Sequence, residues 1–251
     1  MTETAIEFRG VVKRYGDAAA VAGIDLSISK GELVTFLGPS GCGKTTSLRL
    51  IAGLELPTEG QVFIAGRDVS RDPASARNVG MVFQSYALFP HMTVLDNVAY
   101  GPTIRGTPKA QAEARAREIL DQVGLAGLEA RLPAELSGGQ QQRVAVARAI
   151  VQQPDVILFD EPLSNVDAKL RRKVREEIRS LQRRFGLTAV YVTHDQEEAL
   201  AVSDRIVVMD RGRIAQIGTP ADLYERPATP FIADFIGDAN LIRGQVARGR
   251  F

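Results

Sequence analysis

Residues 38–45 read Gly38-Pro39-Ser40-Gly41-Cys42-Gly43-Lys44-Thr45 and match the pattern G-x-x-x-x-G-K-[ST]. The preceding run Leu33–Leu37 is apolar and predicts a buried strand, and Lys44–Ala52 predicts a helix. Between a strand and a helix, the glycines let backbone N–H groups surround an anion, and the helix N-terminus adds a favourable dipole. The stretch therefore predicts a phosphate-binding loop. The alternative, a glycine turn beside an incidental lysine, would need neither the strand nor the helix.

Three residues of this loop have expected roles toward a nucleoside triphosphate. Lys44 would reach the β- and γ-phosphates, the Thr45 hydroxyl would bind Mg²⁺, and Thr46 would support the α-phosphate. The loop alone predicts only that the chain binds ATP or GTP. Hydrolysis requires further groups elsewhere in the sequence.

Two acidic residues end another apolar run, Val156-Ile157-Leu158-Phe159-Asp160-Glu161. Successive side chains of a strand point to opposite faces, so the two carboxylates cannot do the same job. One carboxylate can hold Mg²⁺, usually through water, while the other positions or deprotonates the attacking water. We assign Asp160 to the metal and Glu161 to the base. The alternative is a polar strand end that enters a turn at Pro162.

A second helix start lies at Leu136-Ser137-Gly138-Gly139-Gln140. Ser137, followed three residues later by Gln140, has the spacing of a capping box. Gly138 and Gly139 leave backbone N–H groups bare, so another anion could be held there. A well-capped core helix is the alternative, and both interpretations can hold at once. One nucleotide does not need two phosphate cradles from one chain, so we expect the second to serve a partner's nucleotide.

The order of strand and helix patterns predicts an α/β fold with a mainly parallel sheet flanked by helices, because continuous apolar strands alternate with helices. Two strands before residue 29 suggest an N-terminal antiparallel β subdomain. Residues of about 85–153 are mainly helical and predict a helical subdomain inserted between sheet strands. The 251 residues carry a net charge of +1, a single cysteine and no apolar run of about 18 residues. We therefore expect a cytosolic protein that meets a membrane only through a partner, with no bound nucleic acid.

The phosphate loop, the acidic pair and the stretch 136–143 resemble, in order, the motifs of ABC ATPases, and the resemblance spans about Ile6 to Gly237. It identifies 137–140 as the signature motif and the core as a P-loop NTPase. Further residues match family positions, and the resemblance implies their roles: Tyr15 stacks on adenine, Gln84 binds Mg²⁺ and water near the permease contact, Asp167 belongs to the D-loop at the dimer interface, and His194 contacts the γ-phosphate.

The resemblance also implies partners. ATP and Mg²⁺ would be bound between two copies of the chain, and integral membrane permease subunits would be driven by hydrolysis. Segments 83–91, 223–227 and 229–237 resemble the importer branch that works with substrate-binding proteins for polyamines, ferric iron, sulfate, phosphonates or sugars. We expect a peripheral protein on the cytoplasmic face of the inner membrane. The alternative class is a non-transport ABC ATPase that acts on nucleic acid or ribosomes.

The importer branch predicts an ATPase domain over residues 1–237 and the start of a β-rich regulatory domain over 238–251. Two surface questions stay open. The apolar loop 85–92 is either a permease contact or a loop folded back into the core. The helix 169–185, rich in both charge signs, is either a solvated face with pairs such as Arg172–Glu176 or a nucleic-acid patch, and the first fits its i,i+4 spacing.

Overall fold

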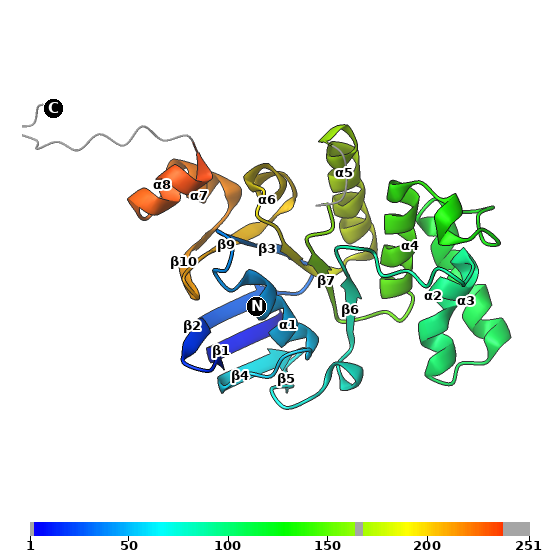
Figure 1. Ribbon diagram of the computed structural model, residues 1–251, viewed down its shortest axis with the longest axis horizontal. Coiled ribbons are helices and arrows are strands. Elements are labelled where there is room, and N and C mark those ends of the chain that lie inside the picture. The colour runs from blue at the N-terminus through cyan, green and yellow to red at the C-terminus, as the bar shows by residue number, and fades with distance from the viewer. Residues whose placement is uncertain (1–2, 164–167, 238–251) are drawn as a thin grey trace, which may run out of the picture.

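The computed structural model describes residues 3–163 and 168–237. The predictions for Asp167 and for 238–251 lie outside these residues. Within them, two sheets and a group of helices form the molecule (Figure 1). The larger sheet has the strand order β10-β9-β3-β8-β7-β6. Its strands are β3 (Leu33–Leu37), β6 (Val79–Val82), β7 (Val156–Asp160), β8 (Thr188–Val192), β9 (Arg205–Asp210) and β10 (Arg213–Gly218). All its neighbouring strands are parallel except β10, which runs antiparallel to β9.

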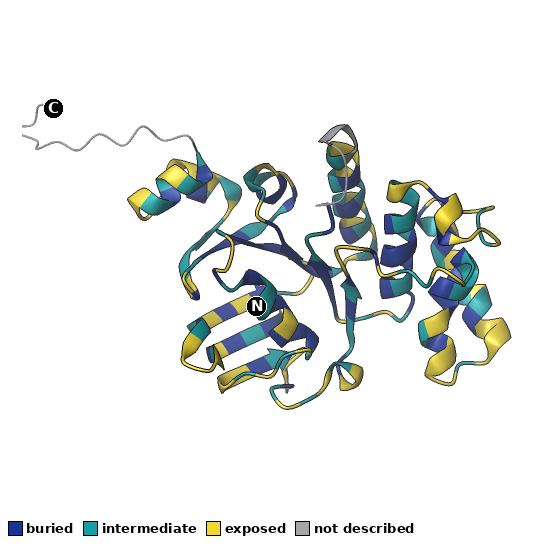
Figure 2. Cartoon of the chain, viewed as in Figure 1, coloured by how far each residue is buried: buried dark blue, intermediate teal, exposed yellow. Residues whose placement is uncertain are grey.

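The smaller sheet is antiparallel and has the order β2-β1-β4-β5. Its strands are β1 (Thr4–Tyr15), β2 (Ala18–Ser29), β4 (Glu59–Ile64) and β5 (Arg67–Asp68). Figure 2 shows buried and exposed residues alternating along these strands, whereas β3 and β8 are buried throughout. A sheet with one solvated face alternates in this way, and a strand covered on both faces does not. The predicted fold class, with its N-terminal antiparallel part, is confirmed.

Helices cover both faces of the parallel sheet. They are α1 (Lys44–Ala52), α5 (Ala168–Phe185), α6 (Gln196–Val202), α7 (Pro220–Glu225) and α8 (Pro230–Ile236). Alternate residues of one strand enter different cores: Leu158 packs with α1 and the antiparallel sheet, while Ile157 packs with α5 and with a further helix, α4 (Gly138–Ile150). This two-residue period is the reason why one apolar run can bury both sides of a strand.

A group of three helices lies between β6 and β7 in the sequence, where the helical insertion was expected. They are α2 (Val94–Ile104), α3 (Lys109–Gln122) and α4 (Gly138–Ile150). Figure 1 shows them together on the side of β6 and β7 away from α1. The apolar stripe of α4 is buried against this group, as the capped-helix interpretation requires.

The apolar loop 85–92 is folded back in part, with half of its residues exposed, so both interpretations left open keep support. Tyr86 is buried, and the Phe89 ring centroid lies 4.7 Å from that of Tyr100. Arg148 of α4 donates to the carbonyls of Tyr86 and Ala87 at 2.9 and 2.8 Å. These contacts hold the loop against the helical group, so only part of its apolar surface remains exposed.

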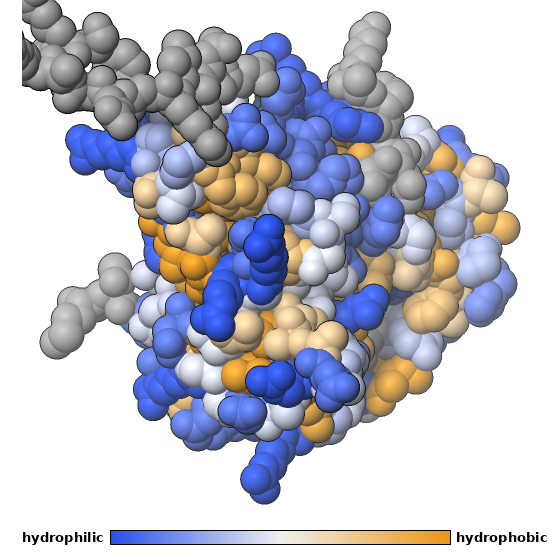
Figure 3. Space-filling model, turned by 60° about the vertical axis from the view of Figure 1, so that its left-hand side comes forward, coloured by the Kyte–Doolittle hydropathy of each residue, from blue (hydrophilic) through white to orange (hydrophobic). Residues whose placement is uncertain are grey.

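The sequence analysis did not predict β10. Its burial pattern is neither alternating nor continuous, because most of its residues are half-buried. Of the helices in the described ranges, none is long and apolar enough to cross a membrane. On the face shown in Figure 3, apolar side chains form several small areas with hydrophilic ones between them.

Candidate nucleotide site

The loop between β3 and α1 depends on glycine at two positions. Gly38 and Gly43 have φ angles of +157° and +106°. A Cβ at Gly38 would lie 2.2 Å from the Met209 carbonyl oxygen, and one at Gly43 would lie 2.4 Å from that of Ala20. Either contact is too short for any side chain. The loop is therefore packed closely against its neighbours at both glycines.

The N-terminus of α1 has no side-chain cap and no acidic residue in its first turn. Uncapped N–H groups and the helix dipole favour an anion at this point. The Lys44 ammonium is buried in the same loop, where it donates to the carbonyls of Gly38 at 2.6 Å and Pro39 at 2.8 Å. Neutral carbonyls satisfy the hydrogens of this ammonium but leave its charge unpaired. The loop therefore fits a phosphate group. Lys44 would give up its two bonds to the carbonyls and donate to phosphate oxygens instead.

Other residues of the loop lie around this ammonium. Cys42 is buried with its Sγ 3.8 Å from Lys44 Nζ, and burial raises the pKa of the thiol. The Cys42 carbonyl accepts from Gly212 N at 3.0 Å, which fastens the loop to the turn between β9 and β10. Thr45 and Thr46 are half-buried in the first turn of α1, while Ser40 and Gly41 are exposed.

The acidic pair lies at the carboxyl end of β7, which β8 separates from the phosphate-loop strand β3 in the sheet. Burial raises the pKa of Asp160, nearby Arg49 lowers it, and the adjacent Glu161 raises it further. Burial disfavours the ionised form of this carboxyl, and a cation beside it would stabilise that form. The position of Asp160 is therefore suited to a Mg²⁺ ligand. Gln84 follows β6 at the same edge, since Val82 pairs with Phe159 in the parallel ladder.

Glu161 and His194 face each other across this edge. Glu161 has a left-handed backbone with φ +44°, and its N–H donates to the Val192 carbonyl at 3.1 Å. This turn directs the carboxylate toward the segment after β8, and its Oε2 lies 3.4 Å from Nδ1 of His194. The Glu161 side chain is 26% exposed and the His194 side chain 62%, so both can meet a ligand from solvent.

A buried network supports the segment that carries His194. Glu198 of α6 accepts from the hydroxyls of Thr193 at 2.7 Å and Tyr191 at 3.1 Å. Asp195 caps α6 by accepting from Glu198 N at 3.0 Å. The sequence analysis missed Glu198, and the one signal for it is its place one turn beyond the capping Asp195.

The signature stretch forms the predicted capping box. Ser137 N donates to Gln140 Oε1 at 2.9 Å, and Gln140 N donates to Ser137 Oγ at 3.4 Å. A Cβ at Gly138 or Gly139 would meet nothing within 4 Å, so this helix start opens to solvent. Figure 1 places α4 with the helical group, away from α1. The chain thus brings Gln84, Asp160, Glu161 and His194 to one sheet edge and presents Ser137 elsewhere.

A phosphate loop after β3, with an acidic pair at the end of β7 in the same parallel sheet, defines a P-loop NTPase. The ABC transporter family model matches residues 21–164, more than half of the chain. The chain belongs to the ABC transporter family.

Several relatives carry the name Fe(3+) ions import ATP-binding protein FbpC, and two of them illustrate the similarity. The one from Rhizobium etli is 64% identical over 241 residues, which cover 96% of this chain and 68% of the relative. The one from Escherichia coli is 55% identical, with 97% and 70% covered.

Solved structures share the fold. CbiO1 of Clostridium perfringens, part of an ABC transporter complex, superposes with a TM-score of 0.81 at 26% identity, covering 89% of this chain and 92% of that one. A dimeric ATP-binding cassette in a post-hydrolysis state with ADP and phosphate gives 0.73 at 32% identity, covering 86% and 98%. The ABC interpretation and its importer branch are thus confirmed over the non-transport alternative. The roles of individual site residues stay predictions.

Proposed function

We propose that the chain hydrolyses ATP as a pair of copies and drives import through membrane permease subunits that receive substrate from a binding protein. The observation that carries the ATPase part is the uncapped loop around the Lys44 ammonium, at the sheet edge where Glu161 and His194 meet. The catalytic unit would be the domain over residues 1–237, peripheral to the cytoplasmic face of the inner membrane.

Each residue has one task in this proposal. The loop 38–45 and Lys44 bind the phosphates, and Thr46 supports the α-phosphate. Mg²⁺, when bound, neutralises charge on the phosphates, and the hydroxyl, amide and carboxyl groups of Thr45, Gln84 and Asp160 would hold it. Glu161 orients the attacking water and takes its proton, and His194 contacts the γ-phosphate. Tyr15 offers its half-exposed ring to the adenine base.

The exposed start of α4 supports the shared site. Its bare N–H groups at Gly138 and Gly139 suit an anion, yet α4 lies away from the chain's own phosphate loop. Two copies arranged with twofold symmetry would place each signature, Ser137 to Gln140, over the partner's nucleotide. ATP then joins the two copies, and loss of the γ-phosphate weakens the joint.

Ferric iron is the cargo that the relatives' names suggest. Both name Fe(3+) import, at 64% and 55% identity over nearly the whole chain. The cargo would be chosen by the permease and the binding protein rather than by this chain. The test is iron-55 uptake in cells that lack the gene, with the wild-type chain or Glu161→Gln restored. Uptake with the wild type alone supports the proposal, while equal uptake of iron in both strains contradicts it.

A further inference from the structure

A polar cluster surrounds Tyr15, the last residue of β1, and includes Lys13 and Glu55, which belong to none of the nucleotide motifs. Lys13 Nζ lies 5.1 Å from the centroid of the Tyr15 ring. The same ammonium lies 2.7 Å from Glu55 Oε2 and donates to the Leu56 carbonyl at 3.0 Å. A cation at this distance interacts favourably with an aromatic ring, so Lys13 bridges Glu55 and Tyr15.

Glu55 belongs to the turn that ends α1. Its N–H and that of Leu54 donate to the Arg49 carbonyl at 3.2 and 3.0 Å, which ties the turn to the last residues of the helix. The Lys13 and Glu55 side chains are only 14% and 25% exposed, so solvent screens the pair less than a surface pair. The ion pair therefore connects the strand that carries Tyr15 to the helix that carries Lys44 and its phosphate loop.

Side chains from the start of α1 and from the turn after it act on the Tyr15 hydroxyl. Burial raises the pKa of Tyr15, the neighbouring Glu55 carboxylate raises it further, and the Thr46 side chain acts in the opposite direction. Lys13 in turn lowers the pKa of Glu55. The tyrosine thus lies between the two ends of α1, with Thr46 in the first turn and Glu55 just after the last.

We propose that Lys13 and Glu55 are positioning residues, which hold the Tyr15 ring at the correct place relative to the phosphate loop so that a purine base can stack on it. This inference rests on the proposed role of Tyr15 as the base platform. The stacking energy depends on the position and tilt of the ring, whereas the groups proposed to bind the phosphates do not include this ring. Loss of the pair should therefore weaken recognition of the base and spare recognition of the phosphates.

The test compares two ligands that share phosphates and differ in the base. Calorimetry without Mg²⁺ would measure Kd for ATP and for inorganic tripolyphosphate. We expect Lys13→Met and Glu55→Gln to raise Kd for ATP about three- to tenfold and to leave Kd for tripolyphosphate within about twofold. Lys13→Arg keeps the cation and should restore ATP affinity.

The matched controls are Arg9→Met and Glu7→Gln. These residues form a pair on the same strand, with Arg9 Nε 2.8 Å from Glu7 Oε1 and the Arg9 guanidinium 4.3 Å from the Phe63 ring centroid. This pair is remote from Tyr15 in the strand, so both controls should leave both Kd values unchanged.

Three outcomes would overturn the inference, and they can be told apart. If Tyr15→Ala leaves Kd for ATP unchanged, the base platform itself is wrong. If Tyr15→Ala raises Kd for ATP but Lys13→Met and Glu55→Gln do not, Tyr15 remains the base platform and the positioning role of the pair is wrong. If these two variants raise Kd for tripolyphosphate as much as Kd for ATP, the pair supports the whole site rather than the base platform alone.

Discussion

Glu161 Oε2 lies 3.4 Å from Nδ1 of His194, although the two residues follow different strands. Their approach results from the parallel pairing of β7 with β8, in which Asp160 pairs with Val192, and from the left-handed backbone of Glu161. A carboxylate and an imidazole in this arrangement can act on one water and one phosphate. The catalytic prediction follows from that pair.

Glu161→Gln should bind ATP and stop turnover, because an amide can contact water but cannot accept its proton. We expect kcat to fall by at least about a hundredfold while Kd for ATP stays within about twofold. With ATP and Mg²⁺ the variant should elute as a dimer from size-exclusion chromatography. Glu176→Gln, an exposed residue of α5, is the control. A monomeric elution with bound ATP would contradict the shared site.

Ser137→Arg should abolish hydrolysis without weakening ATP binding by the monomer, because the start of α4 lies away from the chain's own loop. Ser137→Ala removes the cap, which costs about 1 kcal/mol of stability, and adds no bulk, so it separates the loss of the hydroxyl from a blocked interface. Hydrolysis rates and nucleotide affinities of both variants would be measured. Equal losses of binding and turnover would place the signature at the monomer's own site.

Lys44→Ala should weaken nucleotide binding by at least about tenfold, because the buried ammonium supplies the positive charge of the cradle. Lys30→Ala is the matched control, since Lys30 is an exposed lysine paired with Glu3 at 2.9 Å. Isothermal titration with ATP would compare them. Unchanged affinity in Lys44→Ala would rule out the phosphate-loop assignment.

The local motifs could be predicted from the sequence, because each depends on neighbours within a few residues. The phosphate loop, the strand before it and the capping box at Ser137 are of this kind. Contacts between distant segments could not be predicted. The Lys13–Glu55 pair joins a strand to a later turn, and the inward packing of Tyr86 depends on Arg148. The strand β10 could not be predicted because most of its side chains are half-buried, so its sequence shows neither the alternating pattern nor the continuous apolar pattern of a strand.

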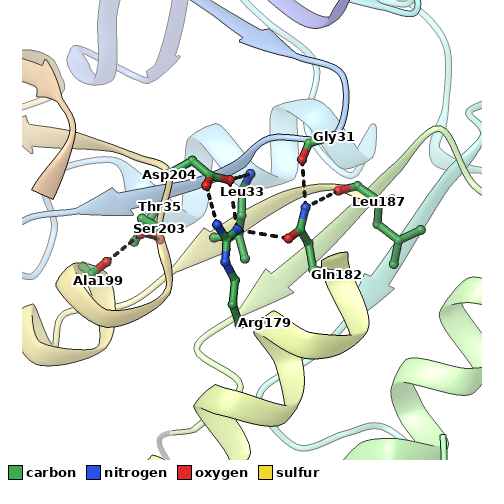
Figure 4. A network of polar contacts seen from close by, with 9 residues as sticks. All are labelled: Gly31, Leu33, Thr35, Arg179, Gln182, Leu187, Ala199, Ser203 and Asp204. Atoms are coloured by element: carbon green, nitrogen blue, oxygen red, sulfur yellow. Dashed lines mark hydrogen bonds and ion pairs between the residues drawn. The ribbon is translucent and has the colours of Figure 1, made fainter. Parts of the chain in front are cut away.

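The ion pair between Arg179 and Asp204, which we call the anchor of α5, leads to a prediction about stability. Arg179 binds Asp204 through both nitrogens, with Nη1 to Oδ2 at 2.9 Å, and Asp204 accepts from Leu33 N at 2.9 Å (Figure 4). Arg179→Met should lower the free energy of unfolding by about 1–2 kcal/mol, because it leaves a partly buried carboxylate without its cation. Arg172→Met removes the exposed pair with Glu176 and should cost less than about 0.5 kcal/mol. Urea denaturation would compare the two, and equal losses would contradict the anchor.

The buried carboxyl of Glu198 makes stability depend on pH. Burial raises its pKa and nearby Asp195 adds to this, while the hydroxyls of Thr193 and Tyr191 and the Arg171 cation act in the opposite direction. A group with a raised pKa holds its proton longer in the folded state than in the unfolded chain. Its contribution to stability therefore falls as the pH rises from the unfolded value, about 4.3, through the raised folded value, and is constant above it.

Glu198→Gln keeps an oxygen that can accept from both hydroxyls and removes the titration. The stability of the wild type relative to this variant should therefore decrease as the pH rises through that window. Urea midpoints at several pH values between about 4.5 and 8 would show it. Glu197→Gln changes the exposed neighbour in the same helix turn and should leave the pH profile parallel to that of the wild type. A difference between the wild type and Glu198→Gln that stays constant with pH would contradict the raised pKa of Glu198.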